Sequence, residues 1–178
     1  MFTFLKAAIR NLKQTGSVIE STPQLAKKMA AIISNKQAVN VIELGAGTGS
    51  VTRYILDKIT SNSRLMSFEL NDELYIKLQE LQDERLFKIH DDVQLLEKYA
   101  SGASVDYIIS CLPLANIKTG QKIRILNACL NVLKPGGYYV QFQYSLNDKA
   151  LLTRKFPSVK LSFEAINIPP AFIYYAQK

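Results

Sequence analysis

Residues 39–50 read Val-Asn-Val-Ile-Glu-Leu-Gly-Ala-Gly-Thr-Gly-Ser, a short apolar strand that runs directly into a glycine turn. Glycine at 45, 47 and 49 allows a tight turn and lets the backbone approach a ligand where a Cβ atom would collide. A second apolar stretch reaches Glu69, twenty residues after Gly49, where a carboxylate can accept the two hydroxyls of a ribose. This pairing is typical of a nucleotide-binding turn between a strand and a helix.

The spacing of the glycines narrows the class of ligand. They follow G-x-G-x-G, with the acidic Glu43 two residues before the first glycine, and lack the G-x-G-x-x-G spacing that binds a dinucleotide pyrophosphate. We therefore expect an adenosine ligand without phosphates. A strand-to-helix turn of purely structural purpose uses the same residues, so the turn alone leaves that alternative open.

Segments with the period of a strand alternate along the chain with segments that have the period of a helix. Polar residues or proline follow several of the strands, which is where an open parallel sheet places its ligand. We expect a three-layer, doubly wound α/β fold with a mostly parallel seven-stranded sheet, a terminal antiparallel hairpin and N-terminal helices. The expected strands are 39–44, 64–70, 86–90, 105–110, 138–144, 159–165 and 171–177, and the expected helices are 2–14, one beginning after Thr22, 51–59, 71–81, 95–99 and 123–133.

Length and composition fit a single domain spanning residues 1–178, with 1–37 as a helical lid or membrane-facing segment and 38–178 as the catalytic core. Hydrophobic residues make up 48% of the chain and charged ones 21%, as in globular proteins, and no apolar run approaches the roughly 18 residues that cross a bilayer. The first residues lack the order of segments that marks a secretory signal, so we expect a cytoplasmic location. Neither Cys111 nor Cys129 has metal-ligand spacing around it, and no metal is expected.

The net charge of +7 is unevenly distributed. Residues 1–40 carry six cations and one anion, residues 41–100 seven cations and eleven anions, and residues 101–178 nine cations and three anions. Two basic ends around an acidic middle favour an anionic partner, either nucleic acid or a membrane surface. Ordinary solvated lysines are the alternative.

The predicted helix at 2–14 has an apolar face that includes Phe2, beside a narrow flank formed by Lys6, Arg10 and Lys13. This pattern is typical of a helix that lies in a membrane interface, where each cation near an anionic leaflet adds about 1 kcal/mol. A helix that packs on its own domain is an equal alternative.

Together these residues resemble the class I S-adenosylmethionine-dependent methyltransferases along nearly the whole chain. The run Glu43-Leu-Gly-Ala-Gly-Thr-Gly49 matches the family's first motif, Glu69 its ribose-binding acid, and Asp92-Val93 the acidic and apolar pair that holds adenine. The resemblance implies S-adenosylmethionine as methyl donor, S-adenosylhomocysteine as product, and no metal. The implied cofactor-binding residues are Glu43, Gly45, Ala46, Gly47, Thr48, Gly49, Glu69, Leu70, Asp92, Val93 and Ser110.

Within that superfamily the chain is most similar to the short bacterial phospholipid N-methyltransferases. The likeness implies transfer of methyl groups to the amine of phosphatidylethanolamine or a related aminolipid, at the cytoplasmic face of a membrane. The chain departs from that family at Glu20, where proline is frequent, at Ala46, where proline is common, and at Cys111, where glycine is frequent. The matching segments are Gly16–Thr22, Ser110–Leu114, Gln141–Tyr144 and Ile168–Ala171.

Methyl transfer to an amine requires an unprotonated nitrogen in line with the donor methyl. We expect hydroxyl and backbone carbonyl groups near Ser110 and Leu112 to accept the amine hydrogens, and Tyr144 to shape the pocket by its hydroxyl or by a cation–π contact. Arg154, in the loop expected after the fifth strand, can meet a lipid phosphate. Thr22 is expected to cap its helix and to belong to a lid over the cofactor.

Two other functions remain as alternatives. An RNA adenine N6-dimethylase shares the expected fold and glycine turn, but Ser110–Leu114 lacks the asparagine and the aromatic residue with which such enzymes hold a flipped base. A nucleic-acid partner is therefore disfavoured. A non-catalytic protein that binds the cofactor or tethers a membrane is the second alternative.

Overall fold

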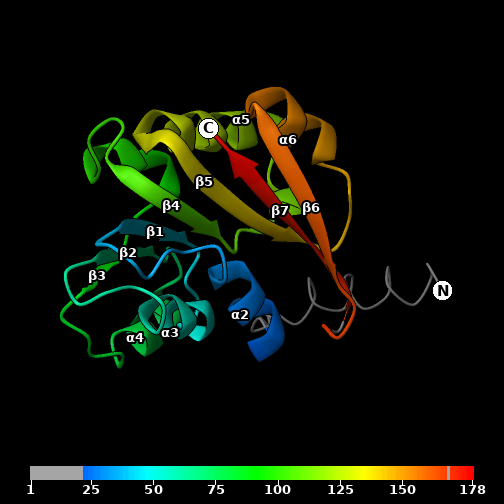
Figure 1. Cartoon of the computed structure of the whole chain (residues 1–178). Coiled ribbons are helices and arrows are strands. Elements are labelled where there is room, and N and C mark those ends of the chain that lie inside the picture. Colours follow the sequence, from blue (N-terminus) through cyan, green and yellow to red (C-terminus); the bar gives the residue numbers. More distant parts are fainter. Residues whose placement is uncertain (1–21, 168) are drawn as a thin grey trace.

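The computed structural model describes residues 22–167 and 169–178 (Figure 1). The helix expected at 2–14 lies outside these residues, so the membrane-binding roles of Phe2, Lys6, Arg10 and Lys13 stay predictions.

Seven strands form one sheet in the order β3-β2-β1-β4-β5-β7-β6. Strands β1 to β5 are parallel to one another, whereas β7 runs antiparallel to both β5 and β6. The expected doubly wound sheet with a terminal hairpin is confirmed. The strands are β1 (Asn40–Leu44), β2 (Arg64–Phe68), β3 (Leu86–Ile89), β4 (Val105–Ser110), β5 (Leu133–Gln143), β6 (Ser158–Glu164) and β7 (Ala171–Gln177).

Helices cover both faces of the sheet, and Figure 1 shows α2, α3 and α4 on one side and α5 and α6 on the other. Each side has its own apolar core, one built around Leu25 and Ile55 and the other around Leu126 and Tyr139. Among the described residues, no helix has the length and apolar character needed to cross a membrane. The helices are α2 (Pro23–Ala30), α3 (Ser50–Leu56), α4 (Asp72–Leu78), α5 (Thr119–Val132) and α6 (Lys149–Lys155), with 3-10 turns η1 (Val93–Lys98) and η2 (Leu114–Asn116).

The strand register brings the carboxyl ends of the central strands level with one another. Leu44 pairs with both Phe68 and Ser110, and Ser110 pairs with Gln141 on β5. The connections after β1 and β4 then diverge, because the strand order reverses between these two neighbours. Open α/β sheets bind ligands in the crevice that such a reversal leaves.

The fifth strand begins earlier than expected. The sequence Lys134-Pro-Gly-Gly137 predicts a turn before a strand at 138, but β5 starts at Leu133 and contains this segment as a bulge. Val105 pairs with Leu133 and Tyr107 with Tyr138, so a single residue of β4 faces four of β5. A bulge of this kind accommodates residues that otherwise break a strand.

The expected loop after the fifth strand is wrong, because residues 149–155 form the helix α6. Arg154 lies in the last turn of this helix, and its Nε donates a hydrogen bond to the Ala150 carbonyl. Only Leu152 of α6 is buried, so seven residues carried too little periodicity to indicate a helix.

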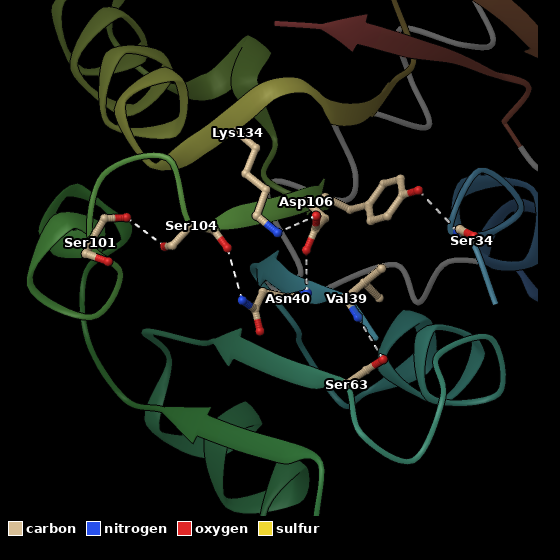
Figure 2. Close-up of polar contacts among 9 residues, drawn as sticks. Ser34, Val39, Asn40, Ser63, Ser101, Ser104, Asp106 and Lys134 are labelled. Atoms are coloured by element: carbon tan, nitrogen blue, oxygen red, sulfur yellow. Dashed lines mark hydrogen bonds and ion pairs between the residues drawn. The ribbon is translucent and has the colours of Figure 1, made fainter. Parts of the chain in front are cut away.

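The amino ends of β1 and β4 are joined by polar contacts at the edge of the sheet opposite the strand carboxyl ends (Figure 2). Asp106 accepts hydrogen bonds from the backbone amide of Asn40 at 2.8 Å and from Lys134 Nζ at 2.7 Å. The Asn40 side chain donates to the Ser104 carbonyl at 3.0 Å. These contacts hold β1 and β4 side by side at their amino ends. They involve none of the residues at the carboxyl ends of the strands.

We predict that Asp106→Ala lowers the free energy of unfolding by about 1–3 kcal/mol, because it leaves the Asn40 amide without its charged acceptor. Lys134→Ala should cost only about 0–1 kcal/mol, because the Lys134 side chain is 43% exposed and its ion pair is weak in water. Urea unfolding measures both. Equal losses for the two variants would contradict this assignment.

Candidate active site

A cavity of about 210 Å³ lies at the carboxyl ends of the strands, beside the glycine turn. Its wall is mostly apolar, with a few polar groups that converge on it, as in sites for small molecules. It is lined by Gly45, Phe68, Glu69, Leu70, Asp92, Val93, Gln94, Leu112, Ile117, Gln121 and Ile125.

The structure brings about half of the residues implied by the sequence to this cavity. Gly45, Glu69, Leu70, Asp92, Val93 and Leu112 line it. The others, Glu43, Ala46, Gly47, Thr48, Gly49, Ser110 and Tyr144, are not part of its wall.

The glycine turn adopts a backbone conformation that other residues rarely accept. Gly45 has φ +75° and Gly49 has φ +87°. A Cβ atom on Gly45 would lie 3.2 Å from Leu112 Cδ2, and one on Gly49 would lie 2.4 Å from Leu81 Cδ1. The turn is also fixed to the neighbouring strand, because the amides of Gly45 and Ala46 both donate to the Phe68 carbonyl at 2.9 Å.

Glu69 is held in place by backbone amides on both sides. Its Oε2 accepts a hydrogen bond from the Gly47 amide and its Oε1 accepts one from the Asn71 amide, each at 2.8 Å. The residue is 8% exposed and lines the cavity. A carboxylate has about four acceptor directions, so both oxygens can still accept a hydroxyl of a ribose.

Asp92 and Gln94 both line the cavity and are bonded to each other. Asp92 accepts hydrogen bonds from the Gln94 amide at 2.8 Å and from Gln94 Nε2 at 3.0 Å. The side-chain oxygen of Gln94 accepts in turn from Arg124 Nε at 3.1 Å. Gln94 thereby links η1, to which it belongs, to α5. No motif of the sequence indicated this contact.

Glu43 lies beneath the glycine turn and is fully buried. Its Oε2 accepts hydrogen bonds from Thr52 Oγ1 and Ser67 Oγ, both at 2.6 Å, so it joins β1, β2 and α3. Burial raises the pKa of Glu43 to about 7, against the effect of the hydrogen bonds from Ser67 and Thr52, and the charge of Glu69 raises it further. Glu43 Oε1 is buried without a hydrogen-bond partner among the described residues.

Residues 42–139, more than half of the chain, match the methyltransferase domain family. The chain belongs to this family. Its fold is that of the S-adenosylmethionine-dependent methyltransferases of class I, and solved structures of such enzymes superimpose on it.

This methyltransferase is similar to several known proteins. It is 26% identical to the ornithine lipid N-methyltransferase of Singulisphaera acidiphila, over 99% of this chain and 95% of that protein. A SAM-dependent methyltransferase from Aquifex aeolicus gives a TM-score of 0.67 at 14% identity, over 89% of this chain and 90% of the other. A putative rRNA methylase from Clostridium thermocellum gives 0.65 at 17% identity, over 90% and 97% of the two chains. The last two likenesses show the fold alone.

The fold supports S-adenosylmethionine as the cofactor of this methyltransferase, and the cavity fits its adenosine part. Glu69 can hold the ribose, and Asp92 can accept a hydrogen bond from the amino group of adenine while Phe68 and Ile125 lie against the cavity. No group of three or more histidine, cysteine, aspartate or glutamate side chains suited to a metal ion occurs within 22–167 and 169–178.

We expected Ser110 and the Leu112 carbonyl to be free to accept hydrogen bonds from an amine. The structure shows that both already have partners. The Leu112 carbonyl already accepts hydrogen bonds from the Leu114 amide at 2.8 Å and from Gln141 Nε2 at 2.9 Å. Ser110 is fully buried, and its side chain bonds the hydroxyl of Tyr139, which donates to Gln141 Oε1 at 2.7 Å. These hydrogen bonds tie the loop after β4 to β5, and of Ser110 and Leu112 only Leu112 lines the cavity.

Tyr144 follows the last residue of β5 and is half-buried. Its ring packs edge-on against Phe142 at 5.6 Å between centroids. Burial raises the pKa of Tyr144, a hydrogen bond from Asn167 lowers it, and Cys111 raises it slightly. Tyr144 and Cys111, the first residue after β4, pack against the same buried cluster.

Three cavity residues from α5 and the segment before it, Ile117, Gln121 and Ile125, were not expected from the sequence. They are separated from the glycine turn by about seventy residues, and no local motif marks them. The spacing of four places Gln121 and Ile125 on one face of α5, whereas Ile117 precedes this helix.

We predict that Glu69→Gln raises the dissociation constant for S-adenosylhomocysteine at least about tenfold, because hydrogen bonds to a charged acceptor contribute about 1.5–3 kcal/mol. Titration calorimetry on the purified protein measures it. Glu73→Gln, an exposed residue of the following helix, is the matched control and should leave the affinity unchanged. The same affinity for both variants would exclude Glu69 from the cofactor site.

A second prediction concerns the buried Glu43. Its pKa is about 7 in the folded protein against an ordinary value of 4.5, so the unfolded chain loses its proton first as the pH rises. Stability should therefore fall, by on the order of 3 kcal/mol, between about pH 4.5 and pH 7.

Glu43→Gln cannot ionise and should lose this part of the pH dependence. Urea unfolding of both proteins at about pH 5 and about pH 8 tests the idea. The variant should gain stability relative to the parent at the higher pH. Parallel curves for the two proteins would show that Glu43 has an ordinary pKa.

Proposed function

We propose that this methyltransferase transfers methyl groups from S-adenosylmethionine to the headgroup amine of an aminolipid, either phosphatidylethanolamine or an ornithine-type lipid. The observation that carries the proposal is the similarity to an ornithine lipid N-methyltransferase, which extends over 99% of this chain and 95% of the relative. A match of that extent includes the segments after β4 and β5, which contain Leu112 and Tyr144, two of the residues expected at the acceptor site.

When bound, S-adenosylmethionine supplies an electrophilic methyl group on a sulfonium. The acceptor nitrogen must lose a proton before it can attack, because an alkylamine is mostly protonated near neutral pH. The half-buried position of Tyr144 beside the ring of Phe142 supports that loss, because partial burial disfavours a charged ammonium. A phenol oxygen there can accept a hydrogen from the neutral amine and orient its lone pair.

Tyr144 also suits the methylated product. The face of a tyrosine ring attracts a quaternary or tertiary ammonium within about 6 Å of its centroid. The ring of Phe142 lies edge-on to it and fixes its orientation. Tyr144 is thus the best candidate among the described residues for contact with the headgroup nitrogen.

We further propose that the protein works as a peripheral protein on the cytoplasmic face of an anionic membrane. The basic and apolar pattern of residues 2–14 supports this, as does the excess of cations in residues 101–178. The guanidinium of Arg154, in the exposed last turn of α6, is the proposed contact for a lipid phosphate. A protein that lacks residues 1–14 should bind anionic liposomes more weakly and keep its affinity for S-adenosylhomocysteine.

The experiment that tests the proposal uses radiolabelled methyl donor with separate acceptors: vesicles of phosphatidylethanolamine, vesicles that contain ornithine lipid, and ribosomal RNA. Label should enter one of the two lipids and not RNA. Label in RNA alone would reject the aminolipid and support the adenine dimethylase alternative. Binding of the donor without transfer to any acceptor would support a non-catalytic protein.

In the same assay, Tyr144→Phe should lower kcat/KM for the lipid about tenfold or more while the affinity for S-adenosylhomocysteine stays within twofold. Tyr138→Phe is the matched control, because Tyr138 lies in the middle of β5 and stacks on Tyr107. Equal activity of the two variants would remove Tyr144 from the acceptor site.

A further inference from the structure

Three large apolar side chains are exposed where β5 and β6 end, and we call them the apolar tip. Leu146 follows β5, Phe163 is the last residue but one of β6, and Ile166 lies in the connection from β6 to β7. Phe163 is 52% exposed and Ile166 69%. Single exposed apolar residues are ordinary on a protein surface, but a group of them at one end of the fold indicates a partner or a membrane.

The apolar tip lies at the same edge of the sheet as the cofactor cavity. Strand β7 runs antiparallel to both β5 and β6, so β5 and β6 point in the same direction. Phe172 of β7 pairs with Gln143 on one side and with Phe163 on the other. The ends of β5 and β6 therefore flank the start of β7, as Figure 1 shows. The cofactor cavity lies at the carboxyl ends of the strands parallel to β5, which is this same edge.

The backbone beneath the apolar tip is held by hydrogen bonds. Lys28 Nζ donates to the Phe163 carbonyl at 2.7 Å, and the Ile166 amide donates to Glu164 Oε1 at 3.1 Å. The ring of Phe163 packs against that of Phe172, with 5.2 Å between the centroids. The exposed side chains are thus attached to an ordered part of the fold, and their substitution should leave that fold intact.

Two exposed cations lie at the same edge. Lys118 immediately precedes α5, which follows β4, and Lys149 is the first residue of α6, which follows β5. The Lys149 amide donates to the Leu146 carbonyl at 3.0 Å, so this cation and one residue of the apolar tip share a turn. No ion pair within the described residues includes Lys118 or Lys149. Both charges are therefore available to an anionic surface.

The carboxylates near these cations already have basic partners. Asp148, next to Lys149, is bound by Lys122 Nζ at 2.6 Å. Glu164, at the end of β6, is paired with Lys28 at 3.5 Å. The ends of β5 and β6 thus combine exposed apolar side chains with an excess of positive charge.

The other end of this edge has the opposite charge. Asp72 and Glu73, both exposed, begin α4 after β2. Ile76, in the next turn of α4, is 67% exposed and so matches Ile166 in type and in exposure. Because an anionic surface repels the two acids, it should contact the edge at β5 and β6 and not at α4.

An aminolipid carries its amine within a few bonds of the bilayer surface, so the edge that holds the cofactor cavity has to face the bilayer. A surface of apolar side chains with cations beside them binds in the membrane interface, where the apolar groups enter about 5–10 Å into the boundary between headgroups and acyl chains. The apolar tip and the two lysines have this composition and this place in the fold.

We propose that the apolar tip and the two exposed lysines form a membrane-docking surface, which holds an anionic bilayer against the edge of the sheet that carries the cofactor cavity. The proposal rests on the proposed aminolipid substrate. It adds to residues 2–14 a second membrane contact, within the folded domain, that sets the orientation of the domain on the bilayer. The surface consists of Leu146, Phe163, Ile166, Lys118 and Lys149.

The first test is sedimentation of the full chain with vesicles of phosphatidylcholine and phosphatidylglycerol. Phe163→Ser and Ile166→Ser should each lower the partition coefficient about fivefold, because each removes an apolar side chain from the interface. Ile76→Ser is the matched control and should bind within twofold of the parent. All three should keep their affinity for S-adenosylhomocysteine, which shows that they are folded. If Phe163→Ser and Ile166→Ser bind vesicles as Ile76→Ser does, the proposal is overturned.

The cations are tested on the same vesicles. Lys149→Gln should lower the partition coefficient about fivefold, because each lysine near an anionic leaflet adds about 1 kcal/mol. On vesicles of phosphatidylcholine alone it should have no effect. An equal loss on both kinds of vesicle would contradict the electrostatic part of the surface.

A fluorescence measurement reports insertion directly. The chain contains no tryptophan, so one introduced indole is the only one in the protein. The emission of Ile166→Trp should move to shorter wavelength on the anionic vesicles and be quenched by lipids brominated in their acyl chains. Ile76→Trp should show neither effect. Equal responses of the two variants would argue against docking through the apolar tip.

Protein is the other possible cover of the apolar tip, either residues 2–14 of the same chain or a second copy that meets the outer strand β6. In the first case Ile166→Trp would emit at short wavelength before vesicles are added. In the second, analytical ultracentrifugation would find a dimer that Ile166→Ser dissociates. Either result, together with unchanged vesicle binding by Ile166→Ser, overturns the proposal.

This proposal and the proposed function fail differently. Weaker vesicle binding by Phe163→Ser and Ile166→Ser, in a protein that methylates no lipid, supports the docking surface and rejects the aminolipid substrate. Methylation of lipid by a protein whose variants bind vesicles like the parent supports the substrate and rejects the docking surface.

Discussion

The site depends on a hydrogen bond of 2.8 Å that the Gly47 amide donates to Glu69 Oε2. The two residues are 22 positions apart in the sequence. It joins the tip of the glycine turn to the end of β2, and the two amide bonds to the Phe68 carbonyl support it. Because the carboxylate is oriented by the protein itself, it needs no rearrangement when a ribose arrives. Preorganised acceptors of this kind bind without loss of further conformational freedom.

A second carboxylate, that of Glu43, lies beneath that contact in different surroundings. Glu43 is fully buried, has one oxygen without a partner among the described residues, and has a pKa raised to about 7. Glu69 has both oxygens bonded to backbone amides and lines the cavity. Because their surroundings differ, the two acids have different roles. Glu43 holds three elements together under the turn, whereas Glu69 faces the cavity.

The sequence predicted the parts of this site that are local and periodic. The run from Glu43 to Gly49, the position of Glu69 and the pair Asp92-Val93 are each visible in a few neighbouring residues, and the doubly wound sheet followed from the alternation of strand and helix. It did not predict α6, since Leu152 is its only buried residue, or the bulge that lets β5 begin at Leu133. Nor could it show that Gln141 engages the Leu112 carbonyl, because that contact joins a side chain of β5 to the loop after β4.

The placement of β7 between β5 and β6 has a consequence for the way the protein is made. Both partners of β7 precede it in the chain, so the ribosome delivers them before the strand that pairs with them. Until Ala171–Gln177 emerges, β5 is an open edge and β6 has no neighbour on either side. Bare edges of this kind pair readily with other chains, so nascent protein arrested before residue 171 should aggregate more readily than protein in which β7 is paired.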